Sequence, residues 1–309
     1  MSRPLTLALA QAPGRHPRDL DGFVEHATTI VRQYPQTQLL VYPELHLAGD
    51  DGDPLDKATL RDSAEPVTTG PRHKRLGAIA GELGVWLCPG TVAELGEDGH
   101  IYNTAVVYSP QGELAASYRK VFPWRPFEDA RPGRDFVVFE IPRVGRVGLS
   151  ICYDGWFPES TRHLAWMGAE LVLNLVKTGT VDREQEIILT RANATVNQVY
   201  IASVNASGAS GLGHSVLVGP EGIILGELLG AAPGVLTAVV ELDAVDNARR
   251  FGSFGITRPW SQLRDDDEPI PMPLYGGALT PQAWSFTNQR QRPSCATEPG
   301  SQAQRNVTH

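Results

Sequence analysis

Short apolar runs alternate along this chain with segments whose apolar residues recur at helical spacing. Residues 5–11 and 38–42 have the length and aliphatic content of buried strands. Between them, residues 19–33 place Phe23, Ala27, Ile30 and Val31 on one face of a helix. Because strand and helix patterns take turns, the sequence predicts an α/β fold.

The same alternation continues through the middle of the chain. A helix is predicted to begin at Pro71 and to end at Gly84, after which residues 85–92 return as a strand. Further on, predicted strands at 147–152, 171–176 and 199–205 alternate with predicted helices at 158–167 and 182–197. In the last of these helices, the stripe expected to pack on a sheet consists of Ile188, Leu189, Ala192 and Val196.

Two predicted antiparallel hairpins interrupt this alternation. One joins residues 102–109 to 113–118 through a turn at 110–112, and the other joins 215–219 to 223–227 through a turn at 220–222. Each half of the chain therefore has strands and helices of its own. This organisation favours two sheets packed back to back, with helices outside them.

Composition limits the domain organisation and the partners. The 309 residues are predicted to form one catalytic domain over 1–258 and a C-terminal extension over 259–309. The extension is acidic and rich in proline, and it is a candidate to wrap a neighbouring subunit, with a disordered end over about 288–309. A formal net charge of -8 argues against a nucleic-acid partner, because phosphate binding needs a basic face.

The cysteines and the hydropathy pattern indicate a compartment. Cys88, Cys152 and Cys295 have neither the spacing of a disulfide framework nor a CxxC pair, which favours a reducing environment. No run approaches the roughly 18 apolar residues that span a bilayer, and the N-terminus lacks a secretion pattern. We therefore expect a cytoplasmic protein with no membrane partner.

Cys152 stands where a fold would place a nucleophile. It ends the apolar run 147–152, and the following segment has Pro158 and Glu159, which suit the first turn of a helix. A thiol between a strand and a helix start is held rigidly, and the helix start and a nearby cation would favour its reactive thiolate form. Taken alone, a buried cysteine is more often inert packing, and Cys88 and Cys295 keep that interpretation.

Three charged residues could complete a catalytic site with this thiol. Glu44 directly follows a buried strand, Lys120 ends the second strand of a hairpin, and Glu128 comes eight residues later. A thiol attacking a carbonyl needs a base, for which Glu44 is the candidate. The developing oxyanion needs donors, for which Lys120 and the backbone N–H of Tyr153 are candidates. Seen singly, each of these charges could equally be a helix-start carboxylate or a solvated strand end.

Three motifs, in this order along the chain, resemble the nitrilase superfamily of carbon-nitrogen hydrolases. They are Pro43-Glu44 after a strand, Tyr118-Arg119-Lys120, and Cys152-Tyr153-Asp154, and the resemblance covers about residues 6–242. Within that superfamily the segments 118–128 and 152–159 look most like the aliphatic amidase and formamidase branch. The resemblance implies a Glu-Lys-Cys triad and a four-layer α-β-β-α sandwich of two mixed sheets. It also implies a homodimer or a higher homo-oligomer, and a second glutamate, Glu128, that orients Lys120 or the substrate.

The expected activity is hydrolysis of a small carboxamide or N-carbamoyl compound by water through a thioester on Cys152, with no metal or cofactor. Trp124, Tyr153 and Trp156 are candidates to line the acyl pocket, although each could equally be a core residue. Asp154 is expected to cap the following helix rather than to titrate in catalysis. Nitrilases commonly carry Cys-Trp-Glu where this chain has Cys-Tyr-Asp, which favours amides over nitriles.

Other activities remain as alternatives. A nitrilase, or an acyl transferase in which an amine intercepts the thioester, would use the same residues. From another class, the chain could be a catalytically silent relative that binds a ligand, or a redox sensor built on Cys152, although no nearby cysteine is placed to resolve an oxidised thiol. The region after Trp260 departs from the long C-terminal arm of the aliphatic amidases.

Overall fold

The computed structural model describes residues 2–48, 57–272, 277, 278 and 280. Contacts divide the chain into two units, residues 1–262 and 263–309. The boundary expected at residue 258 stays a prediction, and the expected disordered end lies outside the described residues. Among the helices of the described part, none has both the length and the hydropathy needed to cross a membrane.

The first sheet contains seven of the described strands in the order β13-β1-β2-β3-β5-β4, with β6 paired to β5. Strands β1, β2 and β3 run parallel to one another, and the remaining pairs are antiparallel. The sheet is therefore mixed, and the predicted hairpin is its β5–β6 pair. The strands are β1 (Pro4–Gln11), β2 (Leu39–Val41), β3 (Trp86–Cys88), β4 (Thr91–Leu95), β5 (Ile101–Tyr108), β6 (Leu114–Arg119) and β13 (Gly234–Glu241).

The second sheet contains six of the described strands in the order β12-β11-β10-β9-β8-β7. The central strands β8, β9 and β10 are parallel, and the outer pairs are antiparallel. The second predicted hairpin is its β11–β12 pair. The strands are β7 (Val138–Ile141), β8 (Gly145–Ile151), β9 (Leu171–Val176), β10 (Tyr200–Asn205), β11 (Val216–Val218) and β12 (Ile224–Glu227).

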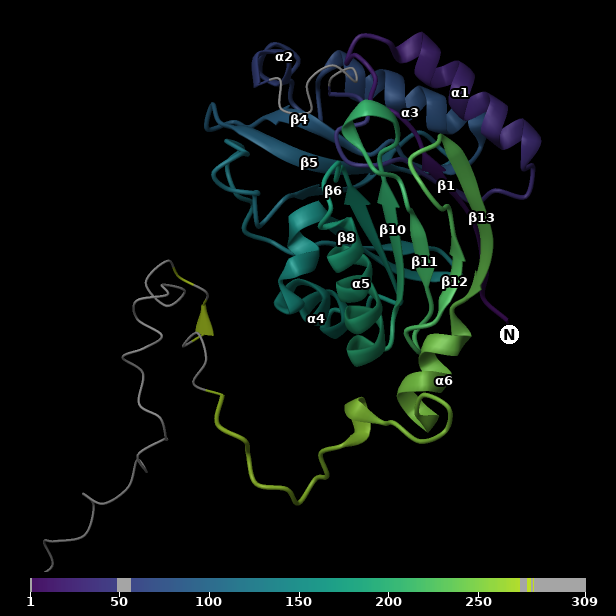
Figure 1. Ribbon diagram of the computed structural model, residues 1–309, viewed down its shortest axis with the longest axis vertical. Coiled ribbons are helices and arrows are strands. Elements are labelled where there is room, and N and C mark those ends of the chain that lie inside the picture. Colours follow the sequence, from purple (N-terminus) through teal and green to yellow (C-terminus); the bar gives the residue numbers. More distant parts are fainter. Residues whose placement is uncertain (1, 49–56, 273–276, 279, 281–309) are drawn as a thin grey trace, which may run out of the picture. The chain divides into compact units, whose positions relative to one another are not determined.

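The helices form the outer layers of a four-layer sandwich (Figure 1). Helices α1 (Leu20–Gln33) and α3 (Pro71–Leu83) cover the first sheet, and α4 (Pro158–Trp166) and α5 (Arg183–Asn197) cover the second. The largest core cluster joins side chains of both sheets, such as Leu7 and Leu149, so the sheets pack face to face. The predicted α-β-β-α architecture is confirmed. The remaining helices are α2 (Lys57–Asp62) and α6 (Asp243–Phe251), with short 3₁₀ turns η1 (Cys152–Trp156), η2 (Gly208–Ser210) and η3 (Pro259–Ser261).

The single strand expected over 85–92 was wrong, because Pro89 and Gly90 divide it into β3 and β4. Proline has no N–H to offer to a sheet, and Gly90 has a φ of 95°, which side-chain-bearing residues rarely adopt. The chain therefore turns between the two strands, and β4 pairs with β5 instead of extending β3. This turn lies against the segment before Glu44, since a Cβ on Gly90 would meet the carbonyl oxygen of Pro43 at 2.0 Å.

The apolar stripe predicted to bury α5 was also wrong. Ile188 is 66% exposed and Val196 is 48% exposed, so this stripe faces outward. The buried face is polar instead and consists of Arg183, Glu186, Thr190, Asn193 and Asn197, together with Ile187 and Ala194. Hydrogen bonds to neighbouring segments compensate the burial of this face, for example from Asn193 to the carbonyl oxygen of Gly155. Hydrophobicity alone therefore assigned the wrong face of the helix to the sheet.

We expect Gly90→Ala to lower the free energy of unfolding by at least about 2 kcal/mol, because both the positive φ and the contact with Pro43 oppose a side chain. Urea unfolding followed by circular dichroism measures this change. Gly84→Ala is the matched control: its φ is 67° but nothing lies within 4 Å, so only the backbone cost of about 1 kcal/mol is expected. Equal losses in the two variants would contradict the assigned contact.

Candidate active site

Glu44 lies in the loop that follows β2 and is 4% exposed. The adjoining Leu45 has a φ of 52°, and its amide donates to the hydroxyl of Thr91 on β4 at 2.9 Å. A hydrogen bond from the amide of Lys177, just after β9, to Oε2 of Glu44 spans 3.1 Å. Loops that follow strands of both sheets therefore hold this carboxylate in place.

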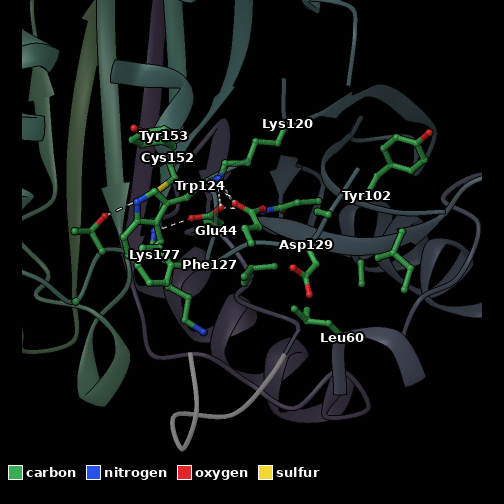
Figure 2. A pocket seen from close by; sticks show the side chains of 18 of the residues that line it. Glu44, Leu60, Tyr102, Lys120, Trp124, Phe127, Asp129, Cys152, Tyr153 and Lys177 are labelled. Carbon is green, nitrogen blue, oxygen red and sulfur yellow. Dashed lines mark hydrogen bonds and ion pairs between the residues drawn. The ribbon is translucent and has the colours of Figure 1, made fainter. Parts of the chain in front are cut away.

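Lys120 directly follows β6, and its side chain is 2% exposed. Its ammonium group donates to Oε1 of Glu44 at 2.9 Å and to Oε2 of Glu128 at 2.6 Å. Figure 2 shows the side chain of Lys120 pointing toward Glu44. The amide of Asn103 donates to the same two carboxylates, at 2.8 Å to Glu44 and 2.9 Å to Glu128. One buried cation and one amide thus hold two carboxylates side by side.

Asn103 was not singled out from the sequence. It lies on β5 beside Thr104, which pairs with Arg119 in the register of the β5–β6 hairpin, so it comes next to Lys120. The available signal was an amide side chain near the start of the largely apolar first hairpin strand. Its importance became visible only with the hairpin register.

The charges of this cluster support one another. Burial lowers the pKa of Lys120, but the negative charges of Glu44 and Glu128 outweigh burial and raise that pKa well above its ordinary value. Burial raises the pKa of Glu128, yet the ion pair with Lys120 outweighs it, and the net pKa is lowered. Lys120 therefore stays a cation and Glu128 stays a carboxylate across the neutral pH range.

Cys152 comes directly after β8 and opens the short helix η1. Its φ of 45° is unusual for a residue with a side chain and marks a strained turn. Burial and the charge of Glu44 raise the pKa of the thiol well above its ordinary value, although Lys120 opposes them. Lys120 thus favours the thiolate, as the sequence led us to expect of a nearby cation, but burial and the carboxylates outweigh it.

Asp154 holds the turn that carries Cys152. It is fully buried, and its Oδ2 accepts from the amide of Ile151 at 2.9 Å and from the hydroxyl of Tyr118 at 2.7 Å. Its Oδ1 accepts from the amide of Phe122 at 2.8 Å. The sequence suggested that Asp154 caps α4, but its side chain caps η1 instead. Its hydrogen bonds also connect the segment around Lys120 to the segment around Cys152.

A cavity of about 580 Å³ contains these groups. Glu44, Lys120, Glu128 and Cys152 all line it, and so do Trp124 and Tyr153 (Figure 2). Trp156 does not belong to the described lining of this cavity. It lines a much smaller space behind Cys152, beside Ser150 and Asn174. The structure therefore brings together the four predicted catalytic residues and two of the three predicted pocket aromatics.

Two further residues of the cavity, Thr178 and Glu186, were missed by sequence reasoning. Thr178 follows β9, and its hydroxyl lies 3.8 Å from the sulfur of Cys152 and 2.8 Å from Oε1 of Glu186. Glu186 comes from the polar buried face of α5.

Within the described residues, no group of three or more His, Cys, Asp or Glu side chains is placed to hold a metal ion.

The pH dependence of stability should reveal Asp154. Burial raises its pKa from 3.8 to about 6, so the folded protein binds this proton more tightly than the unfolded chain does. The stability that this proton contributes is complete below about pH 4 and is lost as the pH rises through about 6. Relative to Asp154→Asn, the free energy of unfolding of the wild type should therefore fall over this range, by on the order of 3 kcal/mol.

Urea unfolding of both proteins at several pH values between 4 and 7 measures this difference. Asp98→Asn provides a control of opposite sign, because the hydrogen bond from Tyr102 lowers the pKa of Asp98. The wild type gains stability over that variant only at pH values below about 4, as the pH rises. Between pH 4 and 7 the difference between the wild type and Asp98→Asn should therefore stay nearly constant. A flat difference between the wild type and Asp154→Asn would contradict the assignment.

Comparisons with known proteins agree with this fold. A formamidase from Bradyrhizobium sp. (strain ORS 278) is 31% identical over 217 residues, which cover 68% of this chain and 62% of that protein. A solved structure of an amidase mutant from Nesterenkonia sp. AN1 is 30% identical with a TM-score of 0.66. It covers 81% of this chain and 94% of its own, and it shows the acetamide moiety of fluoroacetamide added covalently at the active-site cysteine.

Saccharomyces cerevisiae Nit3, of the nitrilase superfamily, shares the fold with a TM-score of 0.71 at 24% identity over 80% of this chain and 94% of its own. The carbon-nitrogen hydrolase family model matches residues 6–250, which include most of β1, all of β2 to β13 and every residue of the cluster around Lys120. This match extends over most of the chain. The chain therefore belongs to the carbon-nitrogen hydrolase family.

Proposed function

We propose that the protein hydrolyses a non-peptide C–N bond in a small carboxamide or N-carbamoyl compound, giving an acid and ammonia or an amine. The observation that best supports this proposal is the arrangement around one cavity of a cysteine on a strained turn, a carboxylate and a buried lysine. These groups supply the nucleophile, the base and the oxyanion partner that amide hydrolysis needs.

In the first half of the proposed reaction, Cys152 attacks the carbonyl carbon of the substrate. Glu44 takes the proton of the thiol as the S–C bond forms, which avoids an unstable free thiolate in this buried place. The carbonyl oxygen becomes an oxyanion, and Lys120 with the backbone N–H of Tyr153 stabilises its charge. Glu44 then gives its proton to the departing nitrogen, the C–N bond breaks, and an acyl thioester on Cys152 remains.

In the second half, Glu44 removes a proton from a water molecule, which attacks the thioester. The S–C bond breaks, the sulfur recovers a proton from Glu44, and the acid leaves. Glu128 acts through Lys120: its carboxylate holds the ammonium group by the 2.6 Å hydrogen bond, and the amide of Trp124 holds that carboxylate in turn at 2.9 Å. Glu128 is therefore proposed as a positioning residue.

The substrate class follows from the cavity and the relatives. A cavity of about 580 Å³ lies within the usual range of roughly 300–1,000 Å³ for small-molecule sites. Trp124 and Tyr153 are proposed to contact the acyl group. Relatives named as a formamidase and an amidase favour an amide over a nitrile. Nitrile hydrolysis, acyl transfer to an amine and ligand binding without turnover are the alternatives that the next experiment separates.

Intact-protein mass spectrometry after brief mixing with panels of amides, nitriles and carbamoyl compounds should show an added acyl mass that is lost in Cys152→Ala. The same variant should lose at least about 10³-fold in kcat, because no other group can form the thioester. Ammonia release is measured in parallel. Cys88→Ala is the matched control, because that thiol is fully buried in the core between the sheets.

Each alternative gives a different result. Full amide turnover by Cys152→Ala would rule out the thioester route. Binding of an amide without ammonia release or added mass would support the silent relative, and a preference for nitriles would support the nitrilase. Transfer of the acyl group to an added primary amine in preference to release of the free acid into water would support acyl transfer.

We also propose that the protein assembles as a homodimer or higher homo-oligomer through α4 and α5. The outer face of these helices carries apolar side chains, including Trp166 at 78% exposure, Ile188 at 66% and Val196 at 48%. Apolar surface of this extent on two adjacent helices is typical of an interface. The cytoplasm remains the proposed location, on the argument from cysteine usage, and 1–258 the proposed catalytic domain.

Ile188→Glu should place a charge in this interface and reduce the particle mass, which size-exclusion chromatography with light scattering measures. Thr29→Glu on the exposed side of α1 is the control and should leave the mass unchanged. An unchanged oligomer in Ile188→Glu would show that the copies meet elsewhere.

A further inference from the structure

A second buried carboxylate approaches Cys152 from the side of the second sheet. Glu186 is 6% exposed and lines the cavity. Its Oε1 accepts the hydroxyl of Thr178 at 2.8 Å, and that hydroxyl oxygen lies 3.8 Å from the sulfur of Cys152. The proposed hydrolysis uses neither residue. The contact from Cys152 through Thr178 to Glu186 therefore needs its own explanation.

The hydroxyl of Thr178 can donate only one hydrogen bond, and this limit decides the direction of its contact with the thiol of Cys152. An ionised carboxylate can only accept, so the hydrogen of Thr178 is directed to Glu186. The hydroxyl oxygen can then only accept from Cys152, which means that the sulfur must carry a hydrogen to make this contact. The hydroxyl of Thr178 therefore stabilises the neutral thiol as a hydrogen-bond acceptor, and it donates no hydrogen bond to a thiolate.

The surroundings fix this direction. Arg183, which is 1% exposed, donates to Oε2 of Glu186 at 3.0 Å and to the hydroxyl of Ser203 on β10 at 3.1 Å. Burial raises the net pKa of Glu186, and the ion pair with Arg183 and the hydrogen bond from Thr178 oppose that rise and favour the charged form. The side chain of Asn205 holds the backbone of Thr178 on both sides, accepting from its amide at 2.8 Å and donating to its carbonyl at 3.0 Å.

We propose that Glu186 is a positioning residue that, acting through Thr178, holds Cys152 as a neutral thiol in the resting enzyme. The inference rests on the proposed function of Cys152 as the nucleophile. The S–H bond has to turn from Thr178 toward Glu44 before attack, so reactivity is confined to the moment when a substrate is in place. Because the thiolate is the form that oxidants attack, the resting enzyme is protected from oxidation.

The charged groups around the sulfur give the sign of the expected effects. Glu44 from the loop after β2 and Glu186 from α5 raise the pKa of the thiol, and Lys120 after β6 lowers it. Removing the charge of Glu186 therefore favours the thiolate. Removing the hydroxyl of Thr178 does so too, because the neutral thiol loses its acceptor. A hydroxyl that donated to the thiolate would have the opposite effect.

The experiment measures how fast methyl methanethiosulfonate modifies Cys152 between pH 6 and 10, by mass spectrometry of the peptide that contains it. This reagent is small, neutral and free of amide bonds, so the measurement does not depend on turnover. Glu186→Gln should lower the pH midpoint of modification by about one unit, and so raise the rate at pH 7 about tenfold. Thr178→Val should lower the pH midpoint as well. Thr178→Ser, which keeps the hydroxyl, should have the wild-type midpoint.

Controls separate this effect from general damage. Glu184→Gln removes the same charge from the exposed face of α5 and should leave the midpoint unchanged. If Glu186→Gln does not fold, the pair Thr178→Val and Thr178→Ser carries the test. A higher midpoint in Thr178→Val, or an unchanged one in folded Glu186→Gln, would overturn the inference. Failure of the proposed function is distinguishable, because it would appear as amide turnover in Cys152→Ala.

Discussion

The ammonium group of Lys120, enclosed between Glu44 and Glu128, is the interaction on which the rest of the site depends. A buried cation without partners would lose its proton, and two neighbouring carboxylates without a cation could not both stay ionised. Lys120 and Glu128 therefore keep each other charged. The amide of Asn103 bridges the two carboxylates and fixes their separation. The oxyanion partner and the base of the proposed reaction are thus parts of one electrostatic unit.

The two sheets bring the parts of this unit to one place. Glu44 and Lys120 follow strands of the first sheet, whereas Cys152, Thr178 and the amide of Lys177 follow strands of the second. The apolar cluster between the sheets sets how they face each other. Asp154 links the two sheets directly, because its carboxylate accepts hydrogen bonds from Tyr118 and Phe122 beside the first sheet and from Ile151 on the second. Packing and one buried carboxylate thus position the nucleophile against its partners.

Carboxylates approach Cys152 from two sides, and the two have different tasks. Glu44 is the proposed base, and the inferred role of Glu186 is to hold the thiol through Thr178 until a substrate arrives. Both raise the pKa of the thiol, and Lys120 alone among the named charges lowers it. A nucleophile of this kind is activated by its substrate and base rather than by its resting environment. The strained turn contributes geometry, not acidity.

Local sequence patterns predicted the α/β alternation, both hairpins, the ends of α3 and the motifs around Glu44, Lys120 and Cys152, because each depends on local periodicity, turn chemistry or adjacent residues. Which face of α5 is buried depends on tertiary packing, since hydrogen bonds across the sandwich stabilise its polar side and leave Ile188 outside. Tertiary packing also decided that Asn103, Thr178 and Glu186 join the site and that Trp156 does not line the main cavity. Those contacts join residues far apart along the chain, and sheet register and packing, which no local pattern encodes, bring them together.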